Sequence, residues 1–163
     1  MKDFSGKLAV ITGGGTGIGR ALTQQLASEG CSVAMCDISQ ADMVTGFLAD
    51  VAMEDHINAF RDDTLAQHDT DHIHLLFNNA GIGGGGSFVT TPRDVWERTF
   101  GVCWYGVYYS ARAFLPALKR ADEGHMINVS SVNGFWASLG PETSHTAYSA
   151  AKFAEKGFTE ALV

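Results

Sequence analysis

The sequence predicts an α/β fold with one doubly wound parallel sheet of about five strands, in a single domain spanning residues 1–163. Short apolar runs without polar alternation indicate strands that are buried on both faces, as in parallel sheets. Segments with helical spacing of apolar residues separate these runs, which is typical of successive β–α–β units. The 163 residues include 19 glycines and 3 prolines, which suits one domain with many tight turns.

The first strand, turn and helix are predicted within residues 7–28. The run Leu8–Ile11 is continuous and apolar, and the glycine-rich segment Thr12–Gly19 (TGGGTGIG) follows it directly. A helix is predicted next from the spacing of Ile18, Ala21, Leu22 and Leu26. Glycines let a ligand approach the backbone closely, and the free N–H groups at a helix start attract a pyrophosphate. The alternative is a tight turn that binds nothing. The strand–turn–helix context favours a dinucleotide site, with these candidate residues: Gly13, Gly15, Thr16, Gly17, Ile18 and Gly19.

A candidate ribose ligand follows the second predicted strand. Gly30 is expected to end the first helix, residues 31–36 to form the strand, and Asp37 to follow it. An acidic residue roughly 20 positions beyond the glycines is where the ribose-binding carboxylate of dinucleotide folds falls. Such a carboxylate accepts hydrogen bonds from the ribose hydroxyls and repels a 2′-phosphate. Because the turn at 12–19 contains no Lys or Arg, NAD is favoured over NADP.

The third strand is predicted at residues 44–51, after an unusually short link. A parallel crossover normally needs a dozen or more residues and usually a helix. We therefore expect no helix between the second and third strands on that face of the sheet. Asp50 and Val51 are expected to end the third strand beside the adenine of the cofactor. A helix is predicted next over residues 54–66, from the stripe of Ile57, Phe60 and Leu65.

A polar turn follows the fourth predicted strand, at residues 73–77. Its sequence is Asn78-Asn79-Ala80-Gly81. An asparagine amide can tie neighbouring strands together, and glycine permits close approach to a ligand. Taken alone, this turn is a structural brace.

The longest predicted helix runs from about residue 93 to residue 120. Thr91 is expected to be its N-cap, with Pro92 in the first helical position and Asp94 in the first turn. Its aromatic residues include Trp104, Tyr105, Tyr108 and Tyr109. They suggest more burial than one sheet face provides, so we expect contacts between subunits of a homo-oligomer through the helices at 93–120 and 148–163, with extra core packing as the alternative. Residues 126–130 predict the fifth strand.

Composition excludes several classes of partner. The formal charge of −7 argues against nucleic acid or an anionic membrane. No apolar stretch approaches ~20 residues, and residues 1–7 do not form a signal peptide, so a soluble cytoplasmic protein is expected. The cysteines, at positions 31, 36 and 103, have no zinc or disulfide spacing and are expected to be reduced. The histidines at 68, 72 and 74 are expected in a solvated loop, not in a metal site.

Candidate catalytic residues follow the fifth strand. Tyr148 and Lys152 are four residues apart, so on a helix their side chains share one face. A nearby ammonium favours the phenolate form and brings the tyrosine toward working pH as a general acid/base. A serine at the end of the fifth strand, within Ser130-Ser131, can hydrogen-bond the same substrate oxygen.

Taken together and in this order, TGGGTGIG, Asp37, NNAG, the strand-end serine and YSAAK resemble the short-chain dehydrogenase/reductase family over nearly the whole chain. The resemblance implies a Rossmann-like fold and an NAD-dependent oxidoreductase that interconverts a secondary alcohol and a ketone by hydride transfer. It implies that Tyr148 is the acid/base, that Lys152 binds the nicotinamide ribose and lowers the tyrosine pKa, and that Ser131 positions the substrate. The residues beside the cofactor would be Asn79, Ala80 and Gly81, with Tyr148 and Lys152 near its nicotinamide end.

The sequence departs from the family pattern in three further respects. Cys103 stands where the family has an asparagine that holds a proton-relaying water. The chain stops at Val163, whereas family members continue through two further strands and a substrate-binding segment. The stretch between Ser131 and Tyr148 is longer than usual, and Phe135, Trp136 and Leu139 are candidates either to line a pocket or to pack the loop. A catalytically silent dinucleotide-binding protein and a fragment of a longer enzyme are the alternatives.

Overall fold

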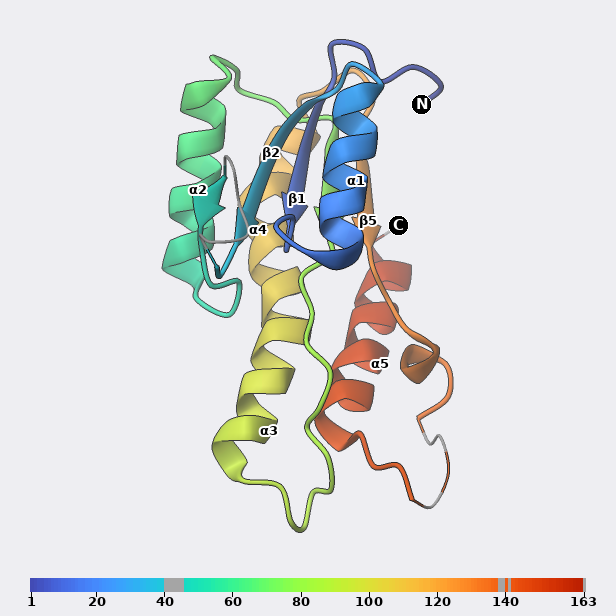
Figure 1. The fold of residues 1–163 in the computed structure, drawn as a ribbon. Helices are drawn as coiled ribbons and strands as arrows, with labels where there is room; N and C mark the ends of the chain where they lie inside the picture. The colour runs from blue at the N-terminus through green and yellow to red at the C-terminus, as the bar shows by residue number, and fades with distance from the viewer. Residues whose placement is uncertain (40–45, 138–139, 141, 163) are drawn as a thin grey trace.

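A single parallel sheet forms the centre of the molecule (Figure 1). The structure is a computed structural model and describes residues 1–39, 46–137, 140 and 142–162. The strands are β1 (Leu8–Thr12), β2 (Ser32–Asp37), β3 (Phe47–Leu48), β4 (Leu75–Asn78) and β5 (His125–Asn128). They pair in the order β3–β2–β1–β4–β5, and every pairing is parallel. The predicted doubly wound α/β fold is therefore confirmed.

The helices connect these strands. They are α1 (Gly17–Ser28), α2 (Glu54–Gln67), α3 (Arg93–Phe100), the π-helical turn η2 (Gly101–Tyr105), α4 (Gly106–Leu118), the 3₁₀ turn η3 (Val132–Gly134) and α5 (Thr146–Ala161). The long predicted helix is thus α3, η2 and α4 in succession. In Figure 1, α3 and the first turns of α5 extend beyond the carboxyl ends of the strands.

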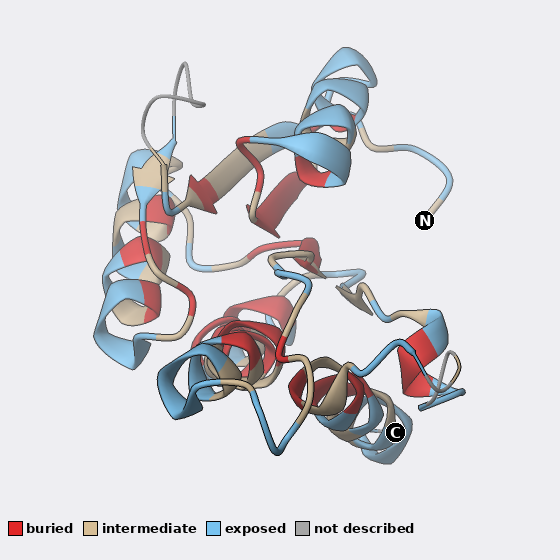
Figure 2. Cartoon of the chain, turned by 60° about the horizontal axis from the view of Figure 1, so that its bottom comes forward, coloured by how far each residue is buried: buried red, intermediate tan, exposed pale blue. Residues whose placement is uncertain are grey.

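Two apolar clusters hold the layers together, one on each face of the sheet. Both include residues of β1, because alternate residues of a strand point to opposite faces. Ala9 and Ile11 pack toward α1 and its buried Leu26. Val10 packs on the other side, and its cluster includes Ile57, Phe60, Leu76 and Phe114. The cartoon in Figure 2 shows α1 on one side of the sheet and α2, α4 and α5 on the other.

Two expectations about element boundaries are corrected. The third strand was expected over residues 44–51, but β3 contains only Phe47 and Leu48 among the described residues, and 44 and 45 lie outside them. Thr91 does not cap the long helix. Pro92 occupies the N-cap position with ψ 143°, so the chain is still extended there, and no side chain caps the helix.

The expectation of a solvated histidine loop is wrong for His74. This side chain is buried, and its Nδ1 accepts a hydrogen bond from the backbone N–H of Leu8 at 3.1 Å. Burial lowers the pKa of His74, and the nearby Lys7 lowers it further. Among the described residues, no group of His, Cys, Asp or Glu is arranged to hold a metal ion.

The aromatic residues of the long helix pack largely against one another. Trp104 meets Phe158 of α5 with ring centroids 5.5 Å apart, and Tyr105 stacks on Tyr109 at 5.6 Å. Tyr105, one of the aromatic residues from which burial was expected, is nevertheless 43% exposed. All three cysteines are free and buried. No helix in the described part of the chain is long and apolar enough to cross a membrane.

Candidate active site

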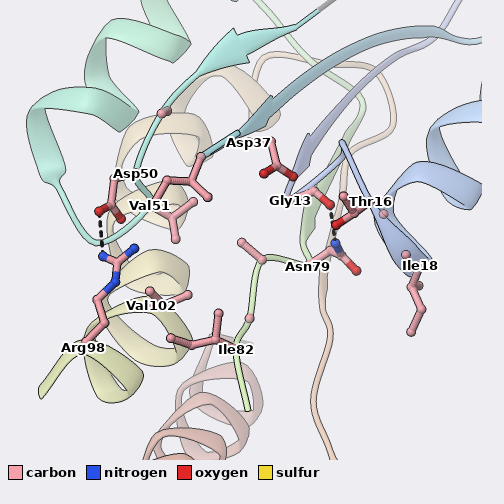
Figure 3. A pocket seen from close by; sticks show the side chains of 16 residues that line it. Gly13, Thr16, Ile18, Asp37, Asp50, Val51, Asn79, Ile82, Arg98 and Val102 are labelled. Carbon is pink, nitrogen blue, oxygen red and sulfur yellow. Dashed lines mark hydrogen bonds and ion pairs between the residues drawn. The ribbon is translucent and has the colours of Figure 1, made fainter. Parts of the chain in front are cut away.

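A cavity of about 360 Å³ lies at the carboxyl ends of the strands, where the chain passes from one half of the sheet to the other (Figure 3). This topological switch point, between β1 and β4, is the usual ligand position in open α/β sheets. Eleven of the predicted cofactor-binding residues line it: Gly13, Thr16, Gly17, Ile18, Gly19, Asp37, Asp50, Val51, Asn79, Ala80 and Gly81. The sequence reasoning did not identify five other lining residues: Ile38, Ala49, Ile82, Arg98 and Val102.

The glycine turn needs its glycines for two different reasons. Gly13 has φ +66°, a left-handed conformation, and a Cβ there would lie 2.9 Å from the Cα of Ala80. A Cβ on Gly19 would collide with the carbonyl oxygen of Gly13 and lie 2.5 Å from Nδ2 of Asn79. The start of α1 is therefore held tightly against the turn after β4, and its residues Gly17, Ile18 and Gly19 line the cavity.

Ile18 illustrates the difference between helical spacing and burial. It was expected on the apolar stripe of the first helix, but its side chain is 73% exposed at the mouth of the cavity. The helix begins at Gly17, and in its first turn Gly19 is buried whereas the Ile18 side chain is exposed.

Asn79 joins the turn after β4 to the turn after β1. Its Nδ2 donates to the carbonyl oxygens of Thr12 at 3.0 Å and Gly13 at 3.1 Å. In return, the Thr12 hydroxyl accepts from the backbone N–H groups of Asn79 and Ala80, both at 3.1 Å. These four bonds fix the floor of the cavity before any ligand is bound.

Asp37 closes the cavity at the end of β2. One of its carboxylate oxygens, Oδ2, accepts a hydrogen bond from the backbone N–H of Gly15 at 3.0 Å. Gly15 itself does not line the cavity and contributes only through this bond. The arrangement holds a negative charge beside the glycine turn.

Arg98 reaches Asp50 across the cavity wall (Figure 3). Its guanidinium donates to Oδ2 of Asp50 at 2.6 Å, and the other carboxylate oxygen accepts from the N–H of Ala52 at 3.0 Å. The pair connects α3 to the segment after β3. The two residues are 48 positions apart, so no local pattern in the sequence could have identified Arg98.

Tyr148 and Lys152 lie on one face of α5, as their spacing predicted. The Lys152 Nζ is 5.8 Å from the centroid of the Tyr148 ring. Lys152 is 4% exposed, and its ammonium donates to the carbonyl oxygen of Val129 and to Oε2 of Glu155, both at 2.6 Å. Neither Tyr148 nor Lys152 lines the cavity that holds the glycine turn. The bond to Val129 fixes the ammonium just beyond the carboxyl end of β5.

Ser131 is the N-cap residue of η3, three residues after the end of β5. Its hydroxyl accepts a hydrogen bond from the backbone N–H of Asn133 at 3.2 Å. The η3 turn packs against α5, and a Cβ on Gly134 would lie 2.9 Å from the carbonyl oxygen of Lys152. Phe135 and Trp136, expected to line a pocket or pack the loop, are 65% and 69% exposed. Leu139 lies outside the described residues.

Cys103 and Glu155 complete the surroundings of Lys152. The Cys103 thiol donates to the carbonyl oxygen of Ile82, a cavity residue, at 3.3 Å. Burial raises the pKa of the Cys103 thiol. The positive charge of Lys152 lowers this pKa, whereas the negative charge of Glu155 raises it. Sequence reasoning missed Glu155, although its position three residues after Lys152 was a visible signal of contact on one helix face.

A sheet in this order, with a glycine turn at its switch point, defines the Rossmann-like class of fold. The sequence model of the protein family described as "short chain dehydrogenase" matches residues 7–163 of this chain. The chain therefore belongs to the short-chain dehydrogenase family.

Individual relatives agree with this assignment. The Mycobacterium tuberculosis protein named "Putative oxidoreductase SadH" is 37% identical over 175 residues, which cover 99% of this chain and 61% of that protein. A Burkholderia phymatum short-chain dehydrogenase/reductase, solved in complex with NAD, has a TM-score of 0.89 and 34% identity over 99% of this chain and 60% of its own. A metagenomic short-chain oxidoreductase in complex with NADP has a TM-score of 0.85 and 31% identity, covering 98% and 75%. The chain thus spans about three-fifths of the length of the first two.

Proposed function

We propose that this protein is an NAD(H)-dependent oxidoreductase that interconverts a secondary alcohol and a ketone. The observation that carries the proposal is the pairing of Tyr148 and Lys152 on one face of α5, with the lysine ammonium fixed beside the end of β5. A phenol and an ammonium in this relation are suited to move a proton to or from a substrate oxygen.

The cavity residues fit a dinucleotide. Gly17, Ile18 and Gly19, the first residues of α1, line the cavity together with Gly13, and the free N–H groups at a helix start suit a pyrophosphate. The Asp37 carboxylate faces the same space and suits ribose hydroxyls. Asp50 and Val51 would lie along the adenine, while Asn79, Ala80 and Gly81 would line the path toward the nicotinamide.

NAD is proposed over NADP because of charge. Asp37 presents a carboxylate at the end of β2, where a 2′-phosphate would be repelled. Arg98, the cation that lines the cavity, already pairs with Asp50 at 2.6 Å. Relatives with either cofactor are known in this family, since one similar structure contains NAD and another contains NADP.

Three residues would carry the proton chemistry. A bound nicotinamide supplies the hydride acceptor or donor. Tyr148 would take the hydroxyl proton of the alcohol, or return it to the ketone oxygen. Ser131 would hydrogen-bond the same oxygen and hold it in place. Lys152, fixed by Val129, would stabilise the deprotonated phenol through its positive charge.

The test combines NADH fluorescence titration with NAD-dependent oxidation of a panel of simple and aromatic secondary alcohols. We expect NADH formation by the wild type, and a loss of about 10²-fold or more in Tyr148→Phe with NADH binding retained. Tyr108→Phe is the matched control, since that phenol lies on α4 near Arg112. Equal turnover by Tyr148→Phe and the wild type would disprove the mechanism.

A wild type that binds NADH without oxidising any alcohol would instead identify a catalytically silent homologue. Cys103→Asn then separates two causes. Restored turnover would assign the silence to the thiol, whereas continued silence would assign it to the rest of the site.

Two properties of the whole protein are also proposed. The exposed side chains of Tyr105 and Phe153 support a homo-oligomer contact through residues 93–120 and 148–163. Three free cysteines support a reducing compartment such as the cytoplasm. Light scattering of the purified protein tests the first proposal, and cell fractionation tests the second.

A further inference from the structure

Glu155 is a buried carboxylate in direct contact with the lysine of the proposed site. Its side chain and that of Lys152 are 1% and 5% exposed, and Oε2 accepts from the Lys152 ammonium at 2.6 Å. The other oxygen, Oε1, is buried and has no hydrogen-bond partner among the described residues. Burying a carboxylate with one unpaired oxygen costs free energy of folding. The presence of a charged residue here therefore calls for a reason other than solubility, which explains charges on the surface.

Few other charges face this pair. Of the elements that pack against α5, η3 carries no ionisable side chain, and η2 carries Cys103 and Tyr105. Burial raises the pKa of the Cys103 thiol, so this group is neutral near pH 7. The arginines of α3 pair elsewhere, Arg93 with Glu97 and Arg98 with Asp50, and Asp94 is exposed. Within the described chain, Glu155 is therefore the charged partner of Lys152.

We propose that Glu155 is a positioning residue for the reaction: its carboxylate holds the Lys152 ammonium at the end of β5 and sets how much of the lysine charge Tyr148 experiences. Two acceptors, one directly after β5 and one on α5, fix the ammonium in a single place next to the Tyr148 ring. The inference rests on the function proposed above, because it takes Lys152 to act on Tyr148.

The position of Glu155 determines the direction of its effect. It is seven residues beyond Tyr148 on the same helix, which corresponds to about 10 Å along the axis. The lysine is nearer to the phenol, so its positive charge dominates, but the carboxylate offsets part of it. Burial raises the pKa of Glu155, while the hydrogen bond and the charge of Lys152 act in the opposite direction.

Glu155→Gln keeps the side-chain volume and an acceptor oxygen but removes the charge. If the carboxylate offsets the lysine charge, the acid-side midpoint of the kcat/KM profile for alcohol oxidation should move down by about one pH unit. A purely structural role would lower the height of the profile without moving it. The matched control is Glu160→Gln, which removes a carboxylate from the same helix that pairs with exposed Lys156, also at 2.6 Å. The control should leave the profile in place.

A second measurement needs no turnover. In ¹⁵N-lysine spectra of the protein without cofactor, Lys152 should give one ammonium resonance protected from solvent exchange, since the other four lysines are not buried. Exchange should accelerate about tenfold or more in Glu155→Gln and stay unchanged in Glu160→Gln. An unaltered exchange rate in Glu155→Gln would overturn the inference.

These readouts separate the two proposals. If no alcohol is oxidised but the lysine is protected through Glu155, the proposed function fails and the positioning contact stands. If turnover occurs but neither the profile nor the exchange rate responds to Glu155→Gln, the function stands and the inference fails. If Glu155→Gln does not fold, the wild-type spectrum decides, because a spectrum without a protected lysine overturns the contact.

Discussion

The side-chain amide of Asn79 donates to the carbonyl oxygen of Gly13 at 3.1 Å, and thereby joins the turn after β4 to the turn after β1. A second bond from the same Nδ2 reaches the carbonyl oxygen of Thr12 at 3.0 Å. Because β1 and β4 are neighbours at the switch point, this one amide ties together two turns that line the cavity. A residue at the carboxyl ends of the strands thus shapes the proposed cofactor site through its hydrogen bonds, without taking part in the proposed reaction.

Asn79→Ala removes both bonds and leaves two part-buried carbonyl oxygens without this donor. We expect the free energy of unfolding to fall by about 1–3 kcal/mol and NADH affinity to weaken. Urea denaturation and NADH titration measure the two effects. Asn58→Ala, which removes an acceptor of Arg61 on the surface of α2, is the control and should change stability by less than about 0.5 kcal/mol. Equal effects of the two substitutions would contradict the proposed role of the brace.

Gly19 and Gly157 provide a matched pair of glycines inside helices. A Cβ at Gly19 would collide with Gly13 and crowd Asn79, whereas a Cβ at Gly157 meets nothing within 4 Å. Gly19→Ala should therefore destabilise the protein by about 1–3 kcal/mol. Gly157→Ala should stabilise it by about 0.5–1 kcal/mol through its helix propensity. Thermal or urea unfolding of both variants decides, and a stabilising Gly19→Ala would show that the turn is looser than its contacts imply.

The sequence was sufficient for the sheet because its signals are local. Continuous apolar runs predicted four strands to within about two residues, and the glycine turn identified the switch point. The third strand was the exception, since the eight residues predicted at 44–51 contain only two residues of described strand at the sheet edge. An edge strand has a neighbour on one side only, so apolar composition overestimates its length.

Contacts between distant elements were not predictable in the same way. Arg98 and Asp50 meet from elements 48 residues apart, and His74 accepts from Leu8 across 66 residues. Neither pairing has a periodic signature. Glu155 is a different case: its spacing from Lys152 was visible, but a charged residue on a helix is normally exposed. Only the packing of η2 and η3 against α5 shows that this helix face is buried.

Asp37 is expected to decide between the two dinucleotides. Asp37→Ser removes the charge that disfavours a 2′-phosphate and the acceptor proposed for the ribose hydroxyls. NAD affinity should fall about tenfold, corresponding to about 1.4 kcal/mol, while NADP affinity should rise. Fluorescence titrations with NADH and NADPH measure the ratio. Asp94→Ser, at an exposed position in the first turn of α3, should leave it unchanged. An unaltered ratio in Asp37→Ser would contradict the proposed preference for NAD.

His74 should make the stability of the fold depend on pH. Its neutral ring accepts from Leu8 in a buried position, and burial lowers its pKa in the folded protein. Between this lowered pKa and the unfolded value near ~6.5, the unfolded chain binds more protons, so the free energy of unfolding decreases as pH falls through that window. Urea midpoints should be constant above about pH 7 and decline below it. His74→Asn keeps a neutral acceptor and should flatten the decline relative to wild type, whereas His68→Asn should preserve it. An undiminished slope in His74→Asn would assign the pH dependence to other groups.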